Sequence, residues 1–405
     1  MKKFNKFLSV AVASAMVMAM AGCGNTDNGS AATGTNAATE SAAASDSAAS
    51  GSVFKIGGIG PTTGGAAVYG LAVQHGAEIA VEEINAAGGI NGYQVEFKFQ
   101  DDEADAEKSV NAYNALKDWG AQIIDGSTTS GACIAVTDKT KEDNMFQITP
   151  SGSAVECVQY DNNFRVCFSN PNQGLASAQY IGENGLAEKI AVIYDSSDVY
   201  SSGIYEKFAK EAENQPFEIV AAEAFTADNK TDFSVQLQKA KDAGADMVFL
   251  PIYYQESALI LTQAAAMGYA PKWFSCDGMD GILGGVDNFD VSLTEGVMLL
   301  TPFAADATDD LTQSFVTKYK EKYGETPNQF AADSYDAIYV IKDAIEKSGV
   351  TPDMSVSDIC DGMKAAMTEI TVDGLTGSGM TWTADGEANK APKAVVIENG
   401  AYKAM

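Results

Sequence analysis

The sequence predicts an α/β protein with two doubly wound lobes, each built on a parallel sheet. Two observations carry this prediction: short β-type runs alternate with helical patterns, and the alternation occurs in two successive series. Strands that alternate with helices form parallel sheets covered by helices on both faces. The body of the chain, residues 53–405, is long enough for two such lobes.

The first series begins with a predicted strand at residues 53–60. A helix is predicted at residues 70–87, because Val73 and Ile84 lie on one apolar face at helical spacing. Residues 93–100 alternate apolar and polar side chains, as a half-buried strand does. The series continues with a helix, a strand, a helix and a strand, at residues 109–117, 122–125, 132–143 and 146–149.

The second series begins and ends on a strand. Strands and helices alternate in the order 190–194, 202–213, 217–222, 233–243, 247–250, 256–267 and 273–275. The remainder adds a strand at 296–300, helices at 311–322, 330–348 and 356–367, and short β-type pieces to the end. Charged residues interrupt every apolar run of the body, so none reaches the roughly 20 residues that a membrane span needs.

The loops that follow strands are the candidate binding loops, because ligands of open parallel sheets bind beyond the carboxyl ends of the strands. These loops are residues 61–69, 126–131, 150–154, 196–201, 251–255 and 276–281. They are rich in Ser, Thr, Tyr and Gly. This composition favours hydrogen-bonded recognition of a small polar group between aromatic walls.

The N-terminus predicts export. A lysine-rich start is followed by an apolar run at residues 7–20, which has the length of a signal-peptide core. The next residues, Met-Ala-Gly-Cys at 20–23, resemble a bacterial lipobox with Met where the motif usually has Leu. We therefore expect residues 1–22 to be a lipoprotein signal peptide and Cys23 to be acylated. The alternative is an ordinary secretory signal next to an unrelated cysteine.

Residues 24–52 consist mostly of Ala, Ser, Thr, Gly and Asn, without an aromatic residue. Such a segment buries too little apolar surface to offset its ordering entropy, so residues 23–52 are expected to form a lipidated, disordered tether. Because one acyl chain binds a membrane weakly, stable anchoring implies more than one chain on Cys23. The predicted location is extracytoplasmic, anchored by lipid to the cell membrane.

Composition excludes several classes of function. The formal net charge of −29 disfavours nucleic-acid binding, which requires basic patches. His75 is the single histidine, so the sequence offers no multi-histidine metal centre and no nucleophile–histidine arrangement beyond His75 itself. The glycine-rich run at 57–60 fails the dinucleotide pattern, because Thr63 stands where the third glycine belongs. We expect no enzyme, no cofactor and no metal.

The chain contains five cysteines besides Cys23, an odd number that cannot all pair. Cys157 and Cys167 are close enough in sequence to form a disulfide, which an exported protein permits. The sequence leaves this pairing open. No cysteine spacing indicates a zinc site.

Five phrases occur in a characteristic order, and the third is the most specific. They are Ile-Gly-Pro-Thr-Thr-Gly at 59–64, Val-Tyr-Gly at 68–70, Ile-Asn-Ala-Ala-Gly-Gly-Ile-Asn-Gly at 84–92, Asp-Asp at 101–102 and Ile-Thr-Pro-Ser at 148–151. With this spacing the chain resembles the leucine/isoleucine/valine-type periplasmic binding proteins, which have the type I fold. The resemblance runs from about residue 53 nearly to the C-terminus.

The resemblance implies two lobes joined by a three-segment hinge. The first lobe would comprise residues 53–171 and 302–376, and the second lobe residues 172–301 and 377–405. The crossings between them are expected near residues 170–172, 301–303 and 374–379. Ligand contacts from both lobes would favour the closed state, because only differential binding shifts such an equilibrium.

The resemblance also implies binding residues on the first lobe. The Ser130 hydroxyl and nearby backbone N–H groups would hold an α-carboxylate. The Ser153 hydroxyl and the Ser151 carbonyl would orient an α-ammonium. Each of these serines could also be a plain turn residue.

On the second lobe, Tyr200, Tyr253 and Asp277 would close over the ligand, with Asp277 pairing the ammonium. Relatives carry Glu at the position of Asp277, so the shorter side chain requires further closure or a bridging water. Tyr69 and Phe330 match positions that wall the side-chain pocket. As alternatives, Asp277 could mark a turn before the next glycine and Phe330 could serve packing alone.

The expected function is transport, in which a monomer captures a small, branched-chain-like amino acid and delivers it to an ABC permease. The alternative is a ligand-sensing module for a separate membrane signalling protein. The sequence does not rank the individual amino acids.

Overall fold

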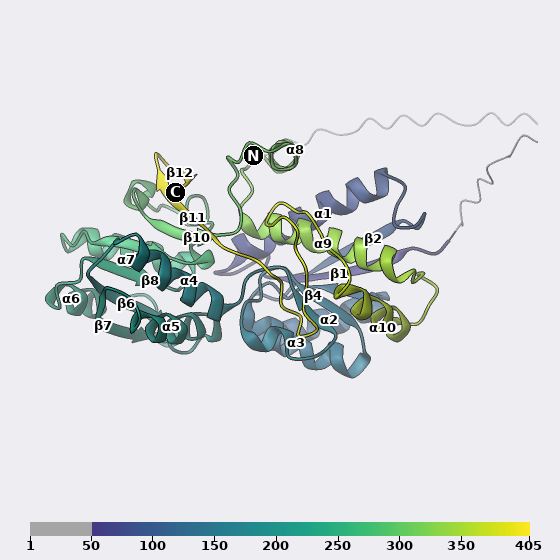
Figure 1. The fold of residues 1–405 in the computed structure, drawn as a ribbon, viewed down its shortest axis with the longest axis horizontal. Helices are drawn as coiled ribbons and strands as arrows, with labels where there is room; N and C mark the ends of the chain where they lie inside the picture. Colours follow the sequence, from purple (N-terminus) through teal and green to yellow (C-terminus); the bar gives the residue numbers. More distant parts are fainter. Residues whose placement is uncertain (1–50) are drawn as a thin grey trace, which may run out of the picture. The chain divides into compact units, whose positions relative to one another are not determined.

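The structure is a computed structural model that describes residues 51–405. The predicted signal peptide, Cys23 and nearly all of the predicted tether lie outside this range. The described part forms two sheets flanked by helices, which confirms the predicted α/β class (Figure 1).

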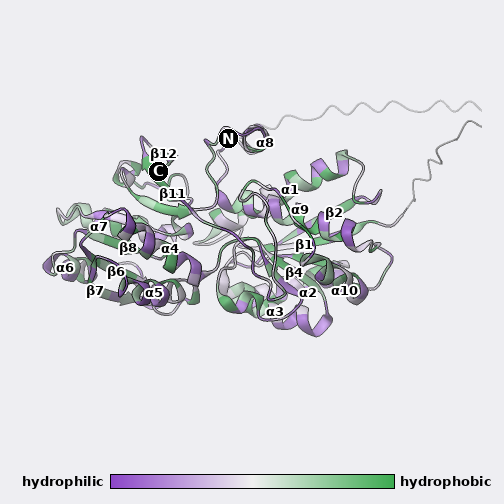
Figure 2. Cartoon of the chain, in the orientation of Figure 1, coloured by the Kyte–Doolittle hydropathy of each residue, from purple (hydrophilic) through white to green (hydrophobic). Residues whose placement is uncertain are grey.

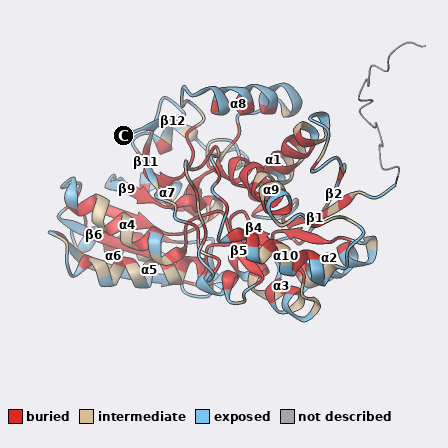
Figure 3. Cartoon of the chain, turned by 45° about the vertical axis from the view of Figure 1, so that its right-hand side comes forward, coloured by how far each residue is buried: buried red, intermediate tan, exposed pale blue. Residues whose placement is uncertain are grey.

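The first sheet has the strand order β2-β1-β3-β4-β5, and all of its neighbouring strands are parallel. Its strands are β1 (Phe54–Gly60), β2 (Val95–Asp101), β3 (Ile123–Asp125), β4 (Phe146–Thr149) and β5 (Asn163–Arg165). The central strands β3 and β4 are wholly buried, as strands covered by helices on both faces must be (Figure 3).

The second sheet has the order β12-β11-β10-β9-β8-β6-β7. Its strands are β6 (Lys189–Asp195), β7 (Glu218–Phe225), β8 (Met247–Leu250), β9 (Lys272–Ser275), β10 (Met298–Thr301), β11 (Lys393–Glu398) and β12 (Ala401–Ala404). Strands β6 to β10 are parallel, whereas β11 and β12 form an antiparallel hairpin at one edge. Asn399 and Gly400 connect the hairpin with φ angles of 53° and 71°, which suits this residue pair in a tight turn.

The helices divide between the two sheets. With the first sheet lie α1 (Ala67–Ala86), α2 (Ala106–Trp119), α3 (Ser130–Asp143), α8 (Asp310–Tyr323), α9 (Gln329–Ser348) and α10 (Val356–Met367). With the second sheet lie α4 (Asn170–Glu183), α5 (Val199–Ala212), α6 (Ser234–Asp242) and α7 (Tyr254–Ala266). Apolar and polar residues are mixed along these helices (Figure 2).

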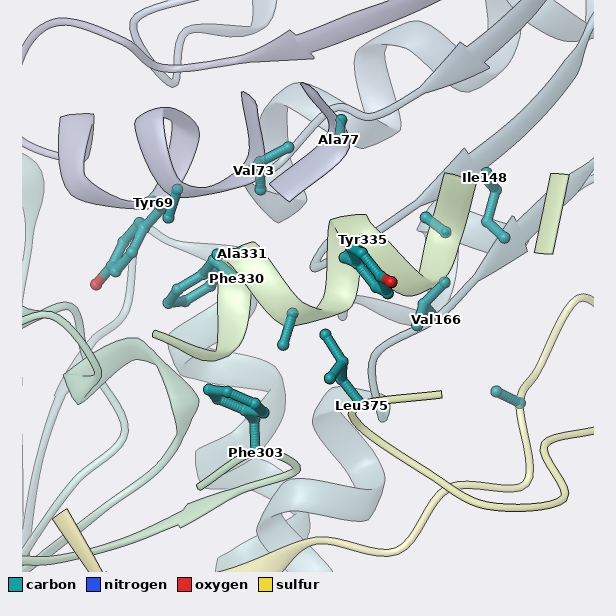
Figure 4. Packing of buried hydrophobic residues seen from close by; sticks show 14 of the residues in the cluster. Tyr69, Val73, Ala77, Ile148, Val166, Phe303, Phe330, Ala331, Tyr335 and Leu375 are labelled. Atoms are coloured by element: carbon teal, nitrogen blue, oxygen red, sulfur yellow. The ribbon is translucent and has the colours of Figure 1, made fainter. Parts of the chain in front are cut away.

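Helices α1 and α9 pack side by side over the first sheet and carry two predicted site residues, Tyr69 and Phe330 (Figure 4). Gly76 permits this close approach, because a Cβ there would collide with the carbonyl oxygen of Ala331. The rings of Tyr69 and Phe330 lie 4.4 Å apart between centroids. The helix pair therefore fixes one aromatic wall at the edge of the sheet.

The structure differs from the sequence prediction mainly at two elements. Strand β5 and helix α4 were not predicted, and α4 begins at Asn170, where only a crossing between lobes was expected. Four helices of the site also begin earlier than predicted, so Ser130 and Tyr200 lie in helical first turns rather than in loops. Asp198 explains one of these starts, since its side chain accepts hydrogen bonds from the N–H groups of Tyr200 and Ser201.

The cysteines of the described residues are all free and buried, so a Cys157–Cys167 disulfide is not present. Cys157 packs instead against Cys133 and Ala154. Its thiol lies 3.6 Å from the carbonyl oxygen of Ser130.

Within residues 51–405, each helix is too short or too polar to cross a membrane. The same range contains no cluster of three or more His, Cys, Asp or Glu side chains suited to a metal ion.

Candidate functional site

A pocket between the two sheets brings together most of the predicted site residues. Its lining consists of Tyr69, Thr128, Thr129, Ser130, Ser151, Tyr200, Tyr253, Asp277, Gly278 and Phe330. Ser153 stands just behind this lining, where its backbone N–H donates to Oγ of Ser130 at 3.2 Å. Thr128, Thr129 and Gly278 are lining residues that the sequence analysis did not select.

The first wall is the N-terminus of α3. Oγ of Ser130 accepts hydrogen bonds from the N–H groups of Ser153 and Ala154, both at 3.2 Å. Both acceptor positions of this hydroxyl are thereby used, so its own hydrogen is free to donate into the pocket. The first N–H groups of a helix also lack partners within the helix and favour an anion. This wall therefore suits a carboxylate.

Ser151 and Ser153 support the same wall in different ways. The Ser151 hydroxyl donates to the carbonyl oxygen of Thr128 at 2.6 Å, which ties the loop after β4 to the loop before α3. Oγ of Ser153 is buried and has no hydrogen-bond partner among residues 51–405. Leaving a buried hydroxyl without a hydrogen bond costs free energy. A polar group of a ligand could supply the missing partner for Ser153.

The opposite wall centres on Asp277, which is 4% exposed and lies in a 3₁₀ turn after β9. Its Oδ1 accepts a hydrogen bond from Oη of Tyr200 at 2.6 Å, and its Oδ2 accepts one from Nε2 of Gln173 at 3.0 Å. Gly278 permits this arrangement, since a Cβ there would lie 2.6 Å from Oη of Tyr200. The carboxylate is thus held in one orientation by two donors.

The electrostatics of this wall favour a cationic partner. Burial raises the pKa of Asp277 to about 7, against the lowering effect of the Tyr200 hydrogen bond, and the nearby Asp333 carboxylate adds to the rise. Asp333 has its own counter-ion, because Nζ of Lys390 lies 2.7 Å from its Oδ1. A ligand ammonium beside Asp277 would stabilise the carboxylate and lower its pKa.

Three tyrosines form the aromatic rim of the pocket. The rings of Tyr200 and Tyr253 stack with centroids 5.0 Å apart, and Tyr69 meets Tyr253 edge-on at 5.5 Å. Burial raises the pKa of all three phenols well above the usual range, so they remain protonated donors.

Tyr69 also connects the two sides of the pocket. From α1, its hydroxyl donates to the carbonyl oxygen of Gly278 and accepts from the N–H of Tyr254 at 3.1 Å. These bonds hold the pocket shut, and the space that remains is about 10 Å³, roughly the room for one water. Entry of a ligand therefore requires the two sides to separate.

A larger cleft of about 270 Å³ adjoins the pocket and shares Tyr200 and Tyr253 with it. Gly65 and Glu103 line one side of this cleft, and Glu256 lines the other.

Gln173 was missed by the sequence analysis. It lies on the unpredicted helix α4, is fully buried, and contacts a residue 104 positions later. The local sequence pattern around Gln173 does not indicate a contact with a residue so distant in the sequence. Thr128 and Thr129 lie in the candidate binding loop at residues 126–131. The only signal for them in the sequence was the high content of Ser and Thr in that loop.

Comparisons with known proteins agree with this geometry. A family model described as periplasmic binding protein matches residues 53–401. Leu/Ile/Val-binding protein homolog 3 of Brucella melitensis is 30% identical over 300 residues, which is 74% of this chain and 80% of the relative. The leucine-, isoleucine-, valine-, threonine-, and alanine-binding protein of Pseudomonas aeruginosa is 30% identical over 302 residues, which is 73% of this chain and 78% of the relative.

Solved structures give the same result. The substrate-binding protein LivJ of a branched-chain amino acid transporter from Streptococcus pneumoniae, in complex with isoleucine, has a TM-score of 0.78 and 29% sequence identity. The alignment covers 87% of this chain and 98% of that protein.

The two sheets and the polar pocket between them define a solute-binding protein. The chain belongs to the periplasmic binding protein family, with Leu/Ile/Val-binding proteins among its relatives, which confirms the resemblance seen in the sequence. This family is extracytoplasmic and is a class of binding proteins rather than of enzymes.

Proposed function

We propose that this chain captures a small, branched-chain-like amino acid between two closing lobes and delivers it to an ABC permease. The observation that supports the proposal is that one wall of the pocket offers hydrogen-bond donors and the other wall offers a carboxylate. The donors of Ser130 and the α3 N-terminus face the buried carboxylate of Asp277 across one pocket. An α-amino acid carries one carboxylate and one ammonium, and so matches both walls at once.

The remaining predicted residues contact other parts of the proposed ligand. Ser153, through its partner-free hydroxyl, and Ser151, through its carbonyl, orient the ammonium together with Asp277. Tyr69, Tyr200, Tyr253 and Phe330 enclose the ligand side chain. The S. pneumoniae relative is a transporter component, which favours delivery over sensing.

Lobe closure is proposed as the capture step. The sequence placed the last division between the lobes at residues 376–377, but we propose a later one, with lobes of residues 53–171 with 302–390, and 172–301 with 393–405. We place the third crossing between Lys390 and Lys393, because residues before it still contact the first sheet. Nε1 of Trp382 donates to the carbonyl oxygen of Arg165 at 2.8 Å, and the N–H of Arg165 donates to the carbonyl oxygen of Gly386 at 3.1 Å.

Membrane attachment through acylated Cys23 belongs to the same proposal, since it keeps the protein near its permease. Its support is the lipobox-like sequence at residues 20–23. Cys23→Ser should release the protein from the membrane fraction into the soluble fraction. Retention of Cys23→Ser in the membrane fraction would place the anchor elsewhere.

A thermal-shift screen of the full chain against amino acids and small carboxylates tests the proposed ligand class. A ligand at 100 times its dissociation constant adds about 2.7 kcal/mol to the free energy of unfolding. We expect small neutral amino acids to raise the melting temperature, and acids lacking an ammonium to have no effect. A rise with carboxylates alone would contradict the proposed role of Asp277.

A further inference from the structure

Thr129 has an unusual environment at the edge of the pocket. It is the N-cap residue of α3, yet its side chain makes no capping hydrogen bond to the residues of the described chain. A threonine at this position normally accepts from an N–H group of the first helical turn. Thr129 is 6% exposed, and its Oγ1 has no hydrogen-bond partner among residues 51–405.

The start of α10 shows what an N-cap hydroxyl ordinarily does. Oγ of Ser355 accepts a hydrogen bond from the N–H of Asp358 at 3.1 Å. Thr129 holds the equivalent position in α3 without making the equivalent bond, so local capping does not explain its hydroxyl.

The other hydroxyls that line the pocket on this wall have protein partners, although those of Ser127 and Ser153, which do not line it, have none within the described chain. Oγ1 of Thr128 donates to the carbonyl oxygen of Ile59 at 3.2 Å, and the hydroxyls of Ser130 and Ser151 also have protein partners. Thr129 lines the pocket beside them, but its hydroxyl has no hydrogen-bond partner among residues 51–405. Because buried hydroxyls are rarely left without a partner, this one points to a polar partner on the ligand.

The position of Thr129 limits which part of a ligand it can reach. It directly precedes Ser130, which the proposed function assigns to the α-carboxylate. A side chain next to that contact would reach ligand atoms close to the α-carbon, such as a substituent on the β-carbon. The hydroxyls of Ser127 and Ser153 are also buried without a partner among the described residues, but neither residue lines the pocket, and the proposed function already assigns Ser153 to the ammonium.

The rest of the lining is also poor in apolar side chains. Among the described residues that line the pocket, Phe330 is the single one with a purely hydrocarbon side chain. A methyl group placed against Thr129 would leave the buried hydroxyl without a partner. A hydroxyl group there would satisfy it, and a site built to bind a substrate hydroxyl rejects the analogue that lacks one.

We infer that Thr129 is a specificity-determining residue, and that the pocket prefers small amino acids with a β-hydroxyl group over their aliphatic isosteres. This inference rests on the proposed function. It changes the expected ligand from an aliphatic branched-chain amino acid to a serine- or threonine-like one.

Isothermal titration calorimetry of the full chain tests this preference with two isosteric or near-isosteric pairs, L-threonine with L-valine and L-serine with L-alanine. We expect the hydroxylated member of each pair to bind about tenfold more tightly, the effect of one hydrogen bond to a buried group. Thr129→Val should abolish this ratio, and Thr129→Ser should preserve it. Thr137→Val changes a buried hydroxyl of the same helix away from the pocket, and should leave the ratio unchanged.

Valine binding as tightly as threonine to the unmodified chain would overturn the inference and leave the proposed function intact. A ratio that survives in Thr129→Val would overturn the role of Thr129. Absence of binding by all four amino acids, and by leucine and isoleucine, would contradict the proposed function itself. Melting temperatures of the variants show whether each one is folded, and the Thr129→Ser variant tests the hydroxyl if Thr129→Val does not fold.

Discussion

Nε2 of Gln173 donates to Oδ2 of Asp277 at 3.0 Å, which joins helix α4 to the turn after β9. Oε1 of the same Gln173 side chain lies 3.4 Å from the backbone N–H of Asp277. One amide therefore holds both the side chain and the backbone of Asp277. This makes Gln173 a positioning residue for the carboxylate.

Gln173→Ala should weaken amino-acid binding by about 1–3 kcal/mol, since it removes a donor to a buried carboxylate. It should also raise the pKa of Asp277, because the charged form loses a hydrogen bond. Calorimetry across a range of pH measures both effects. Gln179→Ala on the same helix is the control, since its side chain contacts Glu211 rather than the pocket. Equal affinities and pH profiles for the two variants would argue against the positioning role.

Ligand affinity should depend on pH through Asp277. Burial raises the pKa of this carboxyl to about 7, so below that pH the free protein must release a proton before it can pair with an ammonium. Affinity should therefore rise with pH up to about 7 and then level off, with a loss of up to about tenfold for each pH unit below it.

Calorimetry in buffers of different ionisation enthalpy measures the protons released on binding. We expect release of close to one proton below the pKa of Asp277 and none well above it. Asp277→Asn should flatten the profile. A flat profile in the unmodified chain would mean that Asp277 does not titrate on binding.

Tyr69 is expected to stabilise the closed state directly. Tyr69→Phe removes the hydroxyl that bonds to Gly278 and Tyr254 across the pocket. Binding should weaken by about 1–3 kcal/mol, mostly through faster dissociation. Stopped-flow kinetics measures the rates. Tyr113→Phe removes a hydroxyl that bonds to Asp143 within the first lobe, and should leave both rates unchanged. Identical dissociation rates for the two variants would count against this role of Tyr69.

Lys390 stabilises a buried acidic cluster beside α9. Its side chain is 1% exposed and pairs with Asp333 at 2.7 Å. Lys390→Met should lower the free energy of unfolding by about 3–5 kcal/mol, because it leaves a buried carboxylate without its counter-ion. Lys342→Met removes a more exposed pair with Glu346 and should cost no more than about 1 kcal/mol. Denaturant unfolding measures both. Similar losses of unfolding free energy in the two variants would show that burial does not increase the contribution of the Lys390–Asp333 pair to stability.

The fold was predictable because its signals are local. Alternating strands and helices, with a continuous apolar run such as β8, indicate a parallel sheet without knowledge of distant contacts. Helix α4 (Asn170–Glu183) was not predicted because the face that it buries consists mostly of small and polar residues, such as Gln173, Gly174 and Ser177. Its packing against α5 stabilises it, and that partner is not visible in the local sequence.

The site was predictable only in part. Strand ends marked the right loops, and the family resemblance selected residues within them, such as Ser130 and Asp277. Gln173 and Thr129 carry no such mark, since their significance depends on which hydrogen bonds the fold makes or leaves unmade. The sequence separation of Cys157 and Cys167 allowed a disulfide, but three-dimensional packing places Cys157 against Cys133.

The central claim is that Asp277 meets the ammonium of an amino acid held by the Ser130 wall. Isothermal titration calorimetry of Asp277→Ala, compared with the unmodified chain, tests it most directly. We expect amino-acid binding to weaken by about 2–5 kcal/mol, the scale for removing one partner of a buried charge pair. Glu103→Ala, which removes an acid that lines the adjoining cleft but not the pocket, should bind as the unmodified chain does. Unchanged affinity in Asp277→Ala would contradict the account.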